Sequence, residues 1–237
     1  MRKAIAIACS MFLLVTTGFS QKEKDKEPKI EGSGNVVTKD IAIQPFDQLE
    51  ASGIFNVVLT QGNKESLKIE AEDNLQPLFE IKNEGTKLVV EMKKDPHFNS
   101  NKKMTIYITF KNLNSMDLKM VGNVSSEGNL NFRDLALANK SVGSVDLALN
   151  AQKLDIENKS VGNLRLSGKA ENATIRSNSV GAIKASDLLV QTMDIDNDGV
   201  GSAEVNAVKE LKVKDSFLGK VRNAGSGTAK RINKVVI

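Results

Sequence analysis

Apolar and polar residues alternate along most of the chain, and from about Leu118 this alternation becomes periodic. A Val-Gly or Leu-Gly pair recurs six times, with spacings of 21, 19, 19, 20 and 18 residues between the glycines. Repeats of this length, built from stretches of period-two alternation, are typical of a solenoid whose coils consist of β-strands. The repeat glycines are Gly122, Gly143, Gly162, Gly181, Gly201 and Gly219.

Stacking the repeats on their glycines predicts which side chains enter the core. The positions two after and six before each glycine are apolar throughout, whereas the position three after is charged from the second repeat onward. In a parallel stack, equivalent residues lie about 4.8 Å apart, which predicts two buried columns and one exposed charged column. The buried columns are Val124, Val145, Leu164, Ile183, Ala203, Val221 and Met116, Leu137, Ile156, Ile175, Ile195, Val213; the charged column is Asp146, Arg165, Lys184, Glu204, Arg222.

The glycines themselves are expected at structural turns. A sharp corner often needs φ > 0, which glycine adopts without strain. Four residues before the glycine, a polar column of side chains is expected to hydrogen-bond the turns or to form a ladder. A leucine-rich horseshoe fits less well because its L-x-x-L-x-L frame is missing, and a propeller needs about twice the period. The polar column is Asn139, Asn158, Ser177, Asn197 and Asp215.

The region before the repeats has strand-like alternation without a clear period. We expect a single β-solenoid domain over residues 35–237, with irregular coils at 35–117 and regular repeats at 118–237. One short helical turn is expected after Asp73-Asn74, where Pro77 limits its length. The polar stretch 95–103 is expected to be a loop.

The N-terminus has the three ordered regions of a signal peptide. Arg2 and Lys3 precede an apolar segment that is too short to span a bilayer, and small residues lie at 18 and 20. We therefore expect residues 1–20 to be a signal peptide cleaved near Ser20, and 21–34 to be a charged spacer. Cys9, the only cysteine, lies inside the apolar segment, so lipidation through it is not expected. The mature chain is predicted to be exported to the periplasm or cell surface, with no transmembrane segment.

Composition narrows the possible functions. Without Arg2 and Lys3 the chain has 31 Lys and Arg against 29 Asp and Glu, a balance too even to indicate nucleic-acid binding. His97 is the only histidine, so zinc sites and histidine-based triads are not expected. There is no Trp and one Tyr, which disfavours a sugar-stacking catalytic groove. No catalytic residue and no cofactor-binding residue is predicted.

One weak candidate for a metal site remains. Asp194, Asp196 and Asp198, followed by Gly199, match the opening of a calcium-binding loop. However, Val205 stands where the bidentate Glu of such a loop is expected, and Ile195 falls in an inward column. The three aspartates are therefore interpreted first as outward side chains, with calcium as the alternative.

Several motifs together resemble the head GIN domain family, whose members are described as auto-transporter adhesins. Gly53 to Leu59 (GIFNVVL) is similar to the family's glycine-hydrophobic segment, and Ser141, Ser160 and Ser179 begin its S-V-G blocks. The likeness covers about residues 36–237, and Gly199 and Phe217 depart from it at the Ser position. The resemblance implies a right-handed parallel β-helix-like fold with about 20 residues per coil. It implies no active site.

Two hypotheses for function follow. The favoured one is a non-catalytic exported envelope protein, an adhesin or interaction module that displays flat solenoid faces to a glycan or protein partner. The alternative is a polysaccharide lyase or hydrolase on the same fold, which needs a groove holding a pair of carboxylates within about 10 Å of each other. The sequence does not predict the ligand or the oligomeric state.

Overall fold

The computed structural model describes residues 29–93 and 97–232, so the predicted signal peptide and most of the predicted spacer lie outside the described residues. Within these ranges the chain is built from β-strands and one 3₁₀ turn, and no helix is long and apolar enough to cross a membrane. The elements are β1 (Ile30–Glu31), β2 (Val36–Ile41), β3 (Gln48–Ile54), β4 (Asn56–Gln61), β5 (Ser66–Glu72), η1 (Gln76–Leu78), β6 (Phe79–Glu84), β7 (Lys87–Met92), β8 (Phe98–Asn99), β9 (Thr105–Phe110), β10 (Ser115–Val121), β11 (Val124–Glu127), β12 (Leu130–Asn139), β13 (Val145–Asn158), β14 (Leu164–Ser177), β15 (Ile183–Asn197), β16 (Ala203–Asp215), β17 (Val221–Asn223) and β18 (Thr228–Arg231).

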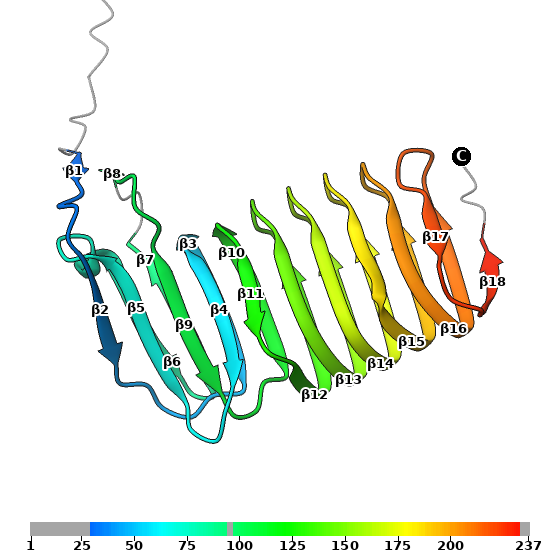
Figure 1. Cartoon of the computed structure of the whole chain (residues 1–237), viewed down its shortest axis with the longest axis horizontal. Coiled ribbons are helices and arrows are strands. Elements are labelled where there is room, and N and C mark those ends of the chain that lie inside the picture. The colour runs from blue at the N-terminus through cyan, green and yellow to red at the C-terminus, as the bar shows by residue number, and fades with distance from the viewer. Residues whose placement is uncertain (1–28, 94–96, 233–237) are drawn as a thin grey trace, which may run out of the picture.

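The strands form a β-solenoid with two faces and two corners (Figure 1). One face contains β9, β4, β11 and the first halves of β13 to β16, and the other contains β7, β3, β10 and the second halves of β12 to β16. The upper corner in Figure 1 carries the repeat glycines. At the lower corner, where each long strand bends, the pairing of β13 with β14 skips Gln152 and Glu171.

The stacking predicted from the glycines is confirmed residue by residue. Val145 pairs with Leu164, Leu164 with Ile183 and Ile183 with Ala203, and the two predicted inward columns are buried throughout. The charged column is also in register, with Asp146 beside Arg165. Their side chains approach to 3.7 Å and are each about half exposed, so this ion pair contributes little stability.

The N-terminal end departs from the parallel pattern expected for the irregular coils. β2 pairs antiparallel with β5, β5 with β9, and β6 with β7. Among the described residues no earlier coil covers the apolar side of the first coil, and these antiparallel pairs close that end of the core. The expected helical turn is the 3₁₀ turn η1, but its N-cap is Leu75 without a side-chain cap. Asp73 instead accepts hydrogen bonds from Ser33 and Asn35.

The polar column of the repeats is a buried ladder under the upper corner. Asn158 is 1% exposed and its Oδ1 accepts hydrogen bonds from Nδ2 of Asn139 at 2.9 Å and from Oγ of Ser160 at 2.8 Å. Its Nδ2 donates to Oγ of Ser179 at 3.1 Å. Two coils after Asn158, Asn197 donates to the backbone oxygens of Gly201 and Gly219. Side chains therefore link the coils of Asn139, Asn158 and Ser179, and Asn197 links its coil to that of Gly219.

The repeat glycines lie where adjacent coils come closest. Gly143, Gly162 and Gly181 have φ of 141°, 142° and 142°, a region that side chains rarely adopt. A Cβ added at Gly162 would lie 2.1 Å from the carbonyl oxygen of Gly143. Gly219 differs from the other repeat glycines because its φ lies outside this positive range.

Replacing a stacked glycine is expected to be costly. Gly162→Ala combines a disfavoured φ with a backbone clash, so we expect the free energy of unfolding to fall by about 3 kcal/mol or more. Gly128→Ala is the matched control, because φ there is 79° and nothing lies within 4 Å of an added Cβ; only about 1 kcal/mol should be lost. Urea unfolding of both variants measures the difference, and equal losses would show that close stacking is not the constraint.

The buried ladder can be tested in the same way. Asn158→Ala leaves the donors of Asn139 and Ser160 without their acceptor in a buried site, which should lower the free energy of unfolding by about 2–3 kcal/mol. Asn178→Ala removes an exposed asparagine one coil away and should change it by less than about 0.5 kcal/mol. Thermal and urea unfolding measure both variants. If the ladder does not stabilise the fold, the two variants should have equal free energies of unfolding.

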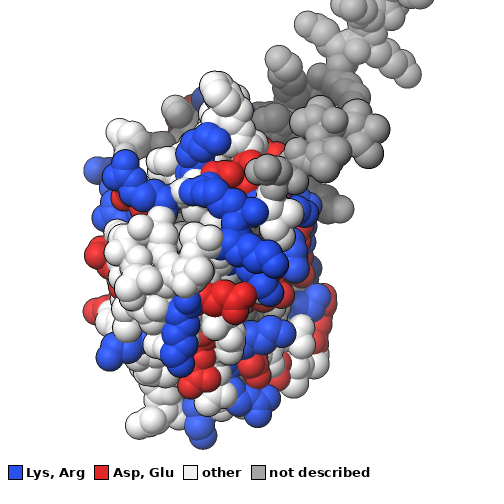
Figure 2. Space-filling view, turned by 90° about the vertical axis from the view of Figure 1, so that its right-hand side faces the viewer, with Lys and Arg blue, Asp and Glu red and all other residues white. Residues whose placement is uncertain are grey.

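An ion pair between half-exposed Arg231 and largely buried Asp215 closes the last coil. Arg231 on β18 lies 2.7 Å from Oδ2 of Asp215 and donates to the Val221 carbonyl at 2.8 Å, while the Val221 N–H donates to the same carboxylate. Burial raises the pKa of Asp215, but the bonds from Val221 and Arg231 outweigh it and hold this pKa below its usual value. This end of the solenoid faces the viewer in Figure 2, where Lys and Arg side chains gather.

The lowered pKa predicts a specific acid sensitivity. A carboxyl with a depressed folded-state pKa adds stability that is present above its unfolded pKa, near 3.8, and is lost as the pH falls through the folded pKa. The unfolding free energy of the unmodified chain should therefore fall more on acidification from about pH 6 to about pH 3 than that of Asp215→Asn. Parallel pH dependences for the two proteins would contradict the prediction.

Candidate functional site

A trough runs along the lower corner of the solenoid, opposite the repeat glycines. It consists of three adjoining hollows of about 450, 200 and 780 Å³. The first and second share Asp47 and Asn112, and the second and third share Asn131 and Phe132. We call this feature the corner trough. Its lining is rich in carboxamide side chains, namely Asn63, Asn112, Asn114, Asn129, Asn131, Asn150, Gln152 and Gln191.

Three of the amides in and beside the trough are held by one another. Gln61, at the end of β4, accepts from the Asn131 N–H at 2.8 Å and donates to its carbonyl at 3.0 Å. Asn150 then donates from Nδ2 to Oδ1 of Asn131 at 3.0 Å. This chain follows the stacking register, in which Asn131 pairs with Asn150 and Asn150 with Lys169. The coils thus hold a row of donors and acceptors parallel to the solenoid axis.

Small side chains provide the depth of the largest hollow. Phe132 pairs with Ala151, and Ala151 with Ala170, so one aromatic ring is followed by two methyl groups along the floor. The ring of Phe132 stacks on Phe110, with centroids 5.9 Å apart and planes at 17°. Phe132 is only 8% exposed, so it supplies a narrow apolar floor and not an open stacking platform.

Carboxylates are sparse in the trough but two line its central hollow. Asp47 and Asp134 both face this hollow of about 200 Å³. Asp134 is paired with Arg133 at 3.0 Å, whereas Oδ1 of Asp47 is buried and has no hydrogen-bond partner among the described residues. The largest hollow contains a single carboxylate, Glu171. The first hollow is lined by Asp47 and Glu65. An acid pair for glycoside cleavage is therefore a question for the first and central hollows, which share Asp47.

A separate hollow of about 550 Å³, outside the trough, lies over Ala136 and Ala138 on the face formed by β10, β12 and β13. Each of its three carboxylates is matched by a cation: Asp117 by Lys119 at 2.6 Å, Asp155 by Arg176 at 3.3 Å, and Glu157 by Lys159 at 2.5 Å. The hydrogen bond from Lys159 holds the pKa of Glu157 below its usual value, so this carboxyl is not a proton donor at neutral pH. The face is an array of ion pairs.

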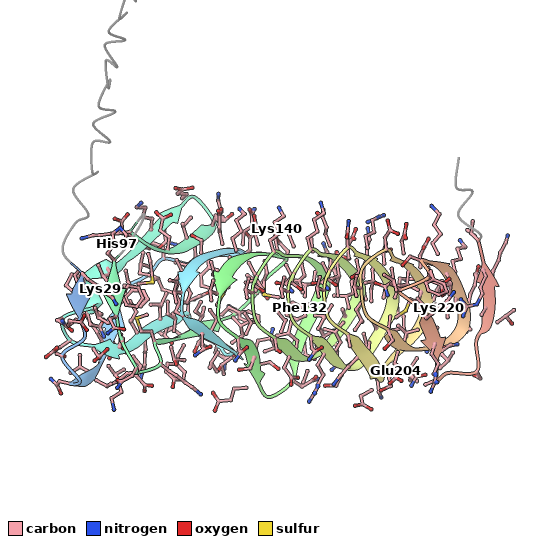
Figure 3. All side chains as sticks on the ribbon, turned by 90° about the horizontal axis from the view of Figure 1, so that it is seen from above. Lys29, His97, Phe132, Lys140, Glu204 and Lys220 are labelled. Atoms are coloured by element: carbon pink, nitrogen blue, oxygen red, sulfur yellow. The ribbon has the colours of Figure 1, made fainter. Side chains whose placement is uncertain are left out.

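The calcium candidates lie in an extended segment. Asp194 and Asp196 are outward residues of β15, and Asp198 follows the strand. Asp196 lies 3.9 Å from Lys214, and the hollow beside Asp194 is also lined by Arg176 and Lys212. Among the described residues, no group of three or more His, Cys, Asp or Glu side chains is arranged to hold a metal ion. His97 is exposed near the N-terminal end, far from these residues (Figure 3).

The upper corner carries an unexpected apolar ridge. The residue before each repeat glycine points outward and is 50–60% exposed, and Ile54, at 45%, extends the row by one coil. Consecutive members pair from Ile54 to Val121 and onward to Val200. We call this row the valine ridge. Its members are Ile54, Val121, Val142, Val161, Val180, Val200 and Leu218.

Sequence reasoning missed both corner features, for different reasons. The ridge could have been predicted from the alternation of inward and outward side chains. If Asn139 points inward, Ser141 also points inward and Val142 points outward. The trough was hidden because the repeats vary in length at that corner. Asn131 lies nine residues after its glycine and Asn150 only seven, yet the two residues pair.

Comparison with known proteins gives one family and several related folds. A family model described as "Putative auto-transporter adhesin, head GIN domain" matches residues 45–227. A crystal structure of a putative adhesin from Bacteroides fragilis is 30% identical, with a TM-score of 0.74 over 86% of this chain and 100% of that chain. A search of curated proteins found no match.

Two further structures, both from Parabacteroides distasonis, share the fold at lower identity. One is described as a putative adhesin, with 19% identity and a TM-score of 0.63 over 87% of this chain and 96% of that chain. The other is described as a putative lipid binding protein, with 18% identity and a TM-score of 0.61 over 86% and 100%. At these identities the likeness concerns the fold alone.

Proposed function

The chain belongs to the family of auto-transporter adhesin, head GIN domain proteins, and we propose that it is an exported, non-catalytic interaction module of the cell envelope that binds a neutral glycan along the corner trough. The observation that carries this proposal is the continuous row of carboxamides at the lower corner. The B. fragilis relative named as an adhesin supports an adhesive role.

The chemistry of the trough suits a polyhydroxylated ligand. Each carboxamide offers both donors and an acceptor, which is what a sugar hydroxyl requires. Because Asn131 and Asn150 are tied to each other and to Gln61, they are oriented before a ligand arrives, which lowers the entropic cost of binding. The largest hollow, of about 780 Å³, falls within the usual range of ligand sites.

The shape also favours a chain over a compact molecule. The three hollows adjoin one another along the solenoid axis, from β9 to β15. Stacked repeats commonly use such extended surfaces for binding. A polymer lying in the trough would meet donors and acceptors on several coils at once.

Binding should depend on the central amides. The double variant Asn131→Ala, Asn150→Ala is expected to weaken binding of the best ligand from a panel of neutral glycans at least about tenfold, since two oriented hydrogen-bonding groups are lost. Calorimetry on the purified exported chain measures the affinity. Asn178→Ala, an exposed asparagine beside the opposite corner, is the matched control and should bind like the unmodified chain. Equal affinity in all three proteins would reject the trough as the site.

The same panel separates the enzyme alternative from the binding module. A hydrolase or lyase would release new sugar ends, and Asp47→Asn or Asp134→Asn would abolish that release because these carboxylates share the central hollow. Running the panel with calcium and with a chelator addresses the aspartates of β15. Calcium-dependent binding that is lost in Asp196→Ala would assign them a metal role; unchanged binding would leave them as surface residues.

A further inference from the structure

The valine ridge is not explained by glycan binding in the trough, because it lies at the opposite corner. Single exposed aliphatic residues are common on protein surfaces, but six paired in register on consecutive coils, with Leu218 after them, form one contiguous stripe. Its members are each between 45% and 60% exposed, so they form a continuous apolar strip and not isolated exposed residues. Surfaces of this kind mark sites of interaction.

The fold does not require apolar side chains at these positions. Val142 contributes to the stack through its backbone, donating to the Met120 carbonyl and accepting from the Gly122 N–H. Its side chain points away from the core and is 51% exposed. Threonine has nearly the same shape and β-propensity and would suit a wet surface better. Apolar residues at six consecutive repeats therefore need a partner.

We propose that the ridge is the interface of a homodimer in which a second copy of this chain lies antiparallel along it. The spacing of the ridge is the first reason. Its side chains repeat at the distance between stacked strands, about 4.8 Å, and another copy presents a row with the same spacing. An isologous contact of this kind pairs the same surface with itself and closes at two subunits.

The charges beside the ridge indicate the relative direction of the two chains. The residue two before each ridge position is also outward, and this flanking column changes sign along the axis: Lys140 and Lys159 lie toward the N-terminal side and Asp198 toward the C-terminal side. Figure 3 looks down on this corner and labels Lys140. An antiparallel pair centred between Val161 and Val180 keeps both flanking columns on the same side of the contact and places Lys140 opposite Asp198 twice. A parallel pair puts the two columns on opposite sides of the ridge, where their charges do not face each other.

The flank on the other side of the ridge is open. The glycine that follows each ridge residue has no side chain, so the valines stand above a strip of backbone. This allows two ridges to approach closely. A standard stable interface buries about 800 Å² per partner, so the contact must include the charged flanking column and the glycine strip as well as the ridge itself.

The ends of the solenoid are less suited to self-association. β18 is the last described strand and carries exposed Lys230 and Arg231, and charged side chains on an outer strand disfavour addition of another strand. The β-faces carry arrays of ion pairs, which are already satisfied within one chain. The ridge is thus the apolar surface that is left for a second copy.

The first test is the oligomeric state of the purified exported chain. Sedimentation velocity over a concentration series should show a reversible dimer, and the triple variant Val142→Thr, Val161→Thr, Val180→Thr should raise its dissociation constant about a hundredfold, because six methyl groups leave the interface. The control Lys153→Thr, Asn172→Thr alters exposed residues of another column and should dimerise normally. A monomer at all concentrations, or a dimer indifferent to the triple variant, would overturn the proposal.

The second test reports the direction of the chains. In a Cys9→Ala background, one chain carries Val142→Cys and another carries Val200→Cys; the antiparallel pair should form a disulfide only when the two are mixed. A parallel pair would instead cross-link Val142→Cys with itself, which would overturn the antiparallel arrangement. Binding of the unmodified monomer to lipid vesicles that is lost in the triple variant would also overturn the proposal, because the ridge would then contact acyl chains and not a second copy. Neither readout involves glycan, so failure here leaves the trough proposal unaffected.

Discussion

The close approach of successive coils at the glycine column is the constraint on which the rest of the solenoid depends. A methyl group on Gly162 would lie 2.1 Å from the Gly143 carbonyl oxygen, and the same conflict recurs at Gly143 and Gly181. Because the backbones meet so closely there, the side chains four residues earlier are enclosed and must satisfy one another. Asn139 and Asn158 do so through their amides, which gives each coil a polar lock beneath an otherwise apolar core. Packing and hydrogen bonding therefore enforce the same register.

This arrangement leaves the outer surface free to vary by position on the coil. Residues on the two faces alternate with core residues, and some are joined in ion pairs between neighbouring coils, such as Arg176 with Asp155. The two corners differ from the faces in the side chains that they expose. One corner presents the aliphatic row of the valine ridge and the other presents amides in the corner trough. A repeat protein can in this way carry two unlike linear surfaces on one core.

The core columns could be read from the sequence because a fixed spacing from one glycine gives the pairing of strands directly. Leu164 and Ile183 fall at the same distance after their glycines and pair as expected. The trough could not be read in this way, because the coils differ in length at the lower corner. The pairing shifts between Arg165 and Ser167, and again between Ala185 and Leu189, so residues at equal spacing no longer lie side by side. The N-terminal end was also beyond reach, since antiparallel closure by β2, β5 and β6 depends on contacts between distant segments and not on a local pattern.

The positions of the two corners have a consequence for binding. In an antiparallel dimer joined along the valine ridge, the corner troughs lie on the outer sides of the pair, because each trough is at the opposite corner from its own ridge (Figure 1). The two troughs face away from each other, so they cannot both lie on one flat surface, but they can engage two segments of a flexible glycan mesh at once. The second contact is then intramolecular, with an effective concentration set by the dimer, so overall binding can exceed that of one trough by a factor on the order of 10²–10⁴ without any new contact. Weak single-site affinity for a glycan is therefore compatible with firm attachment to a mesh that repeats it, and disruption of the ridge would lower attachment while leaving the affinity of each trough unchanged.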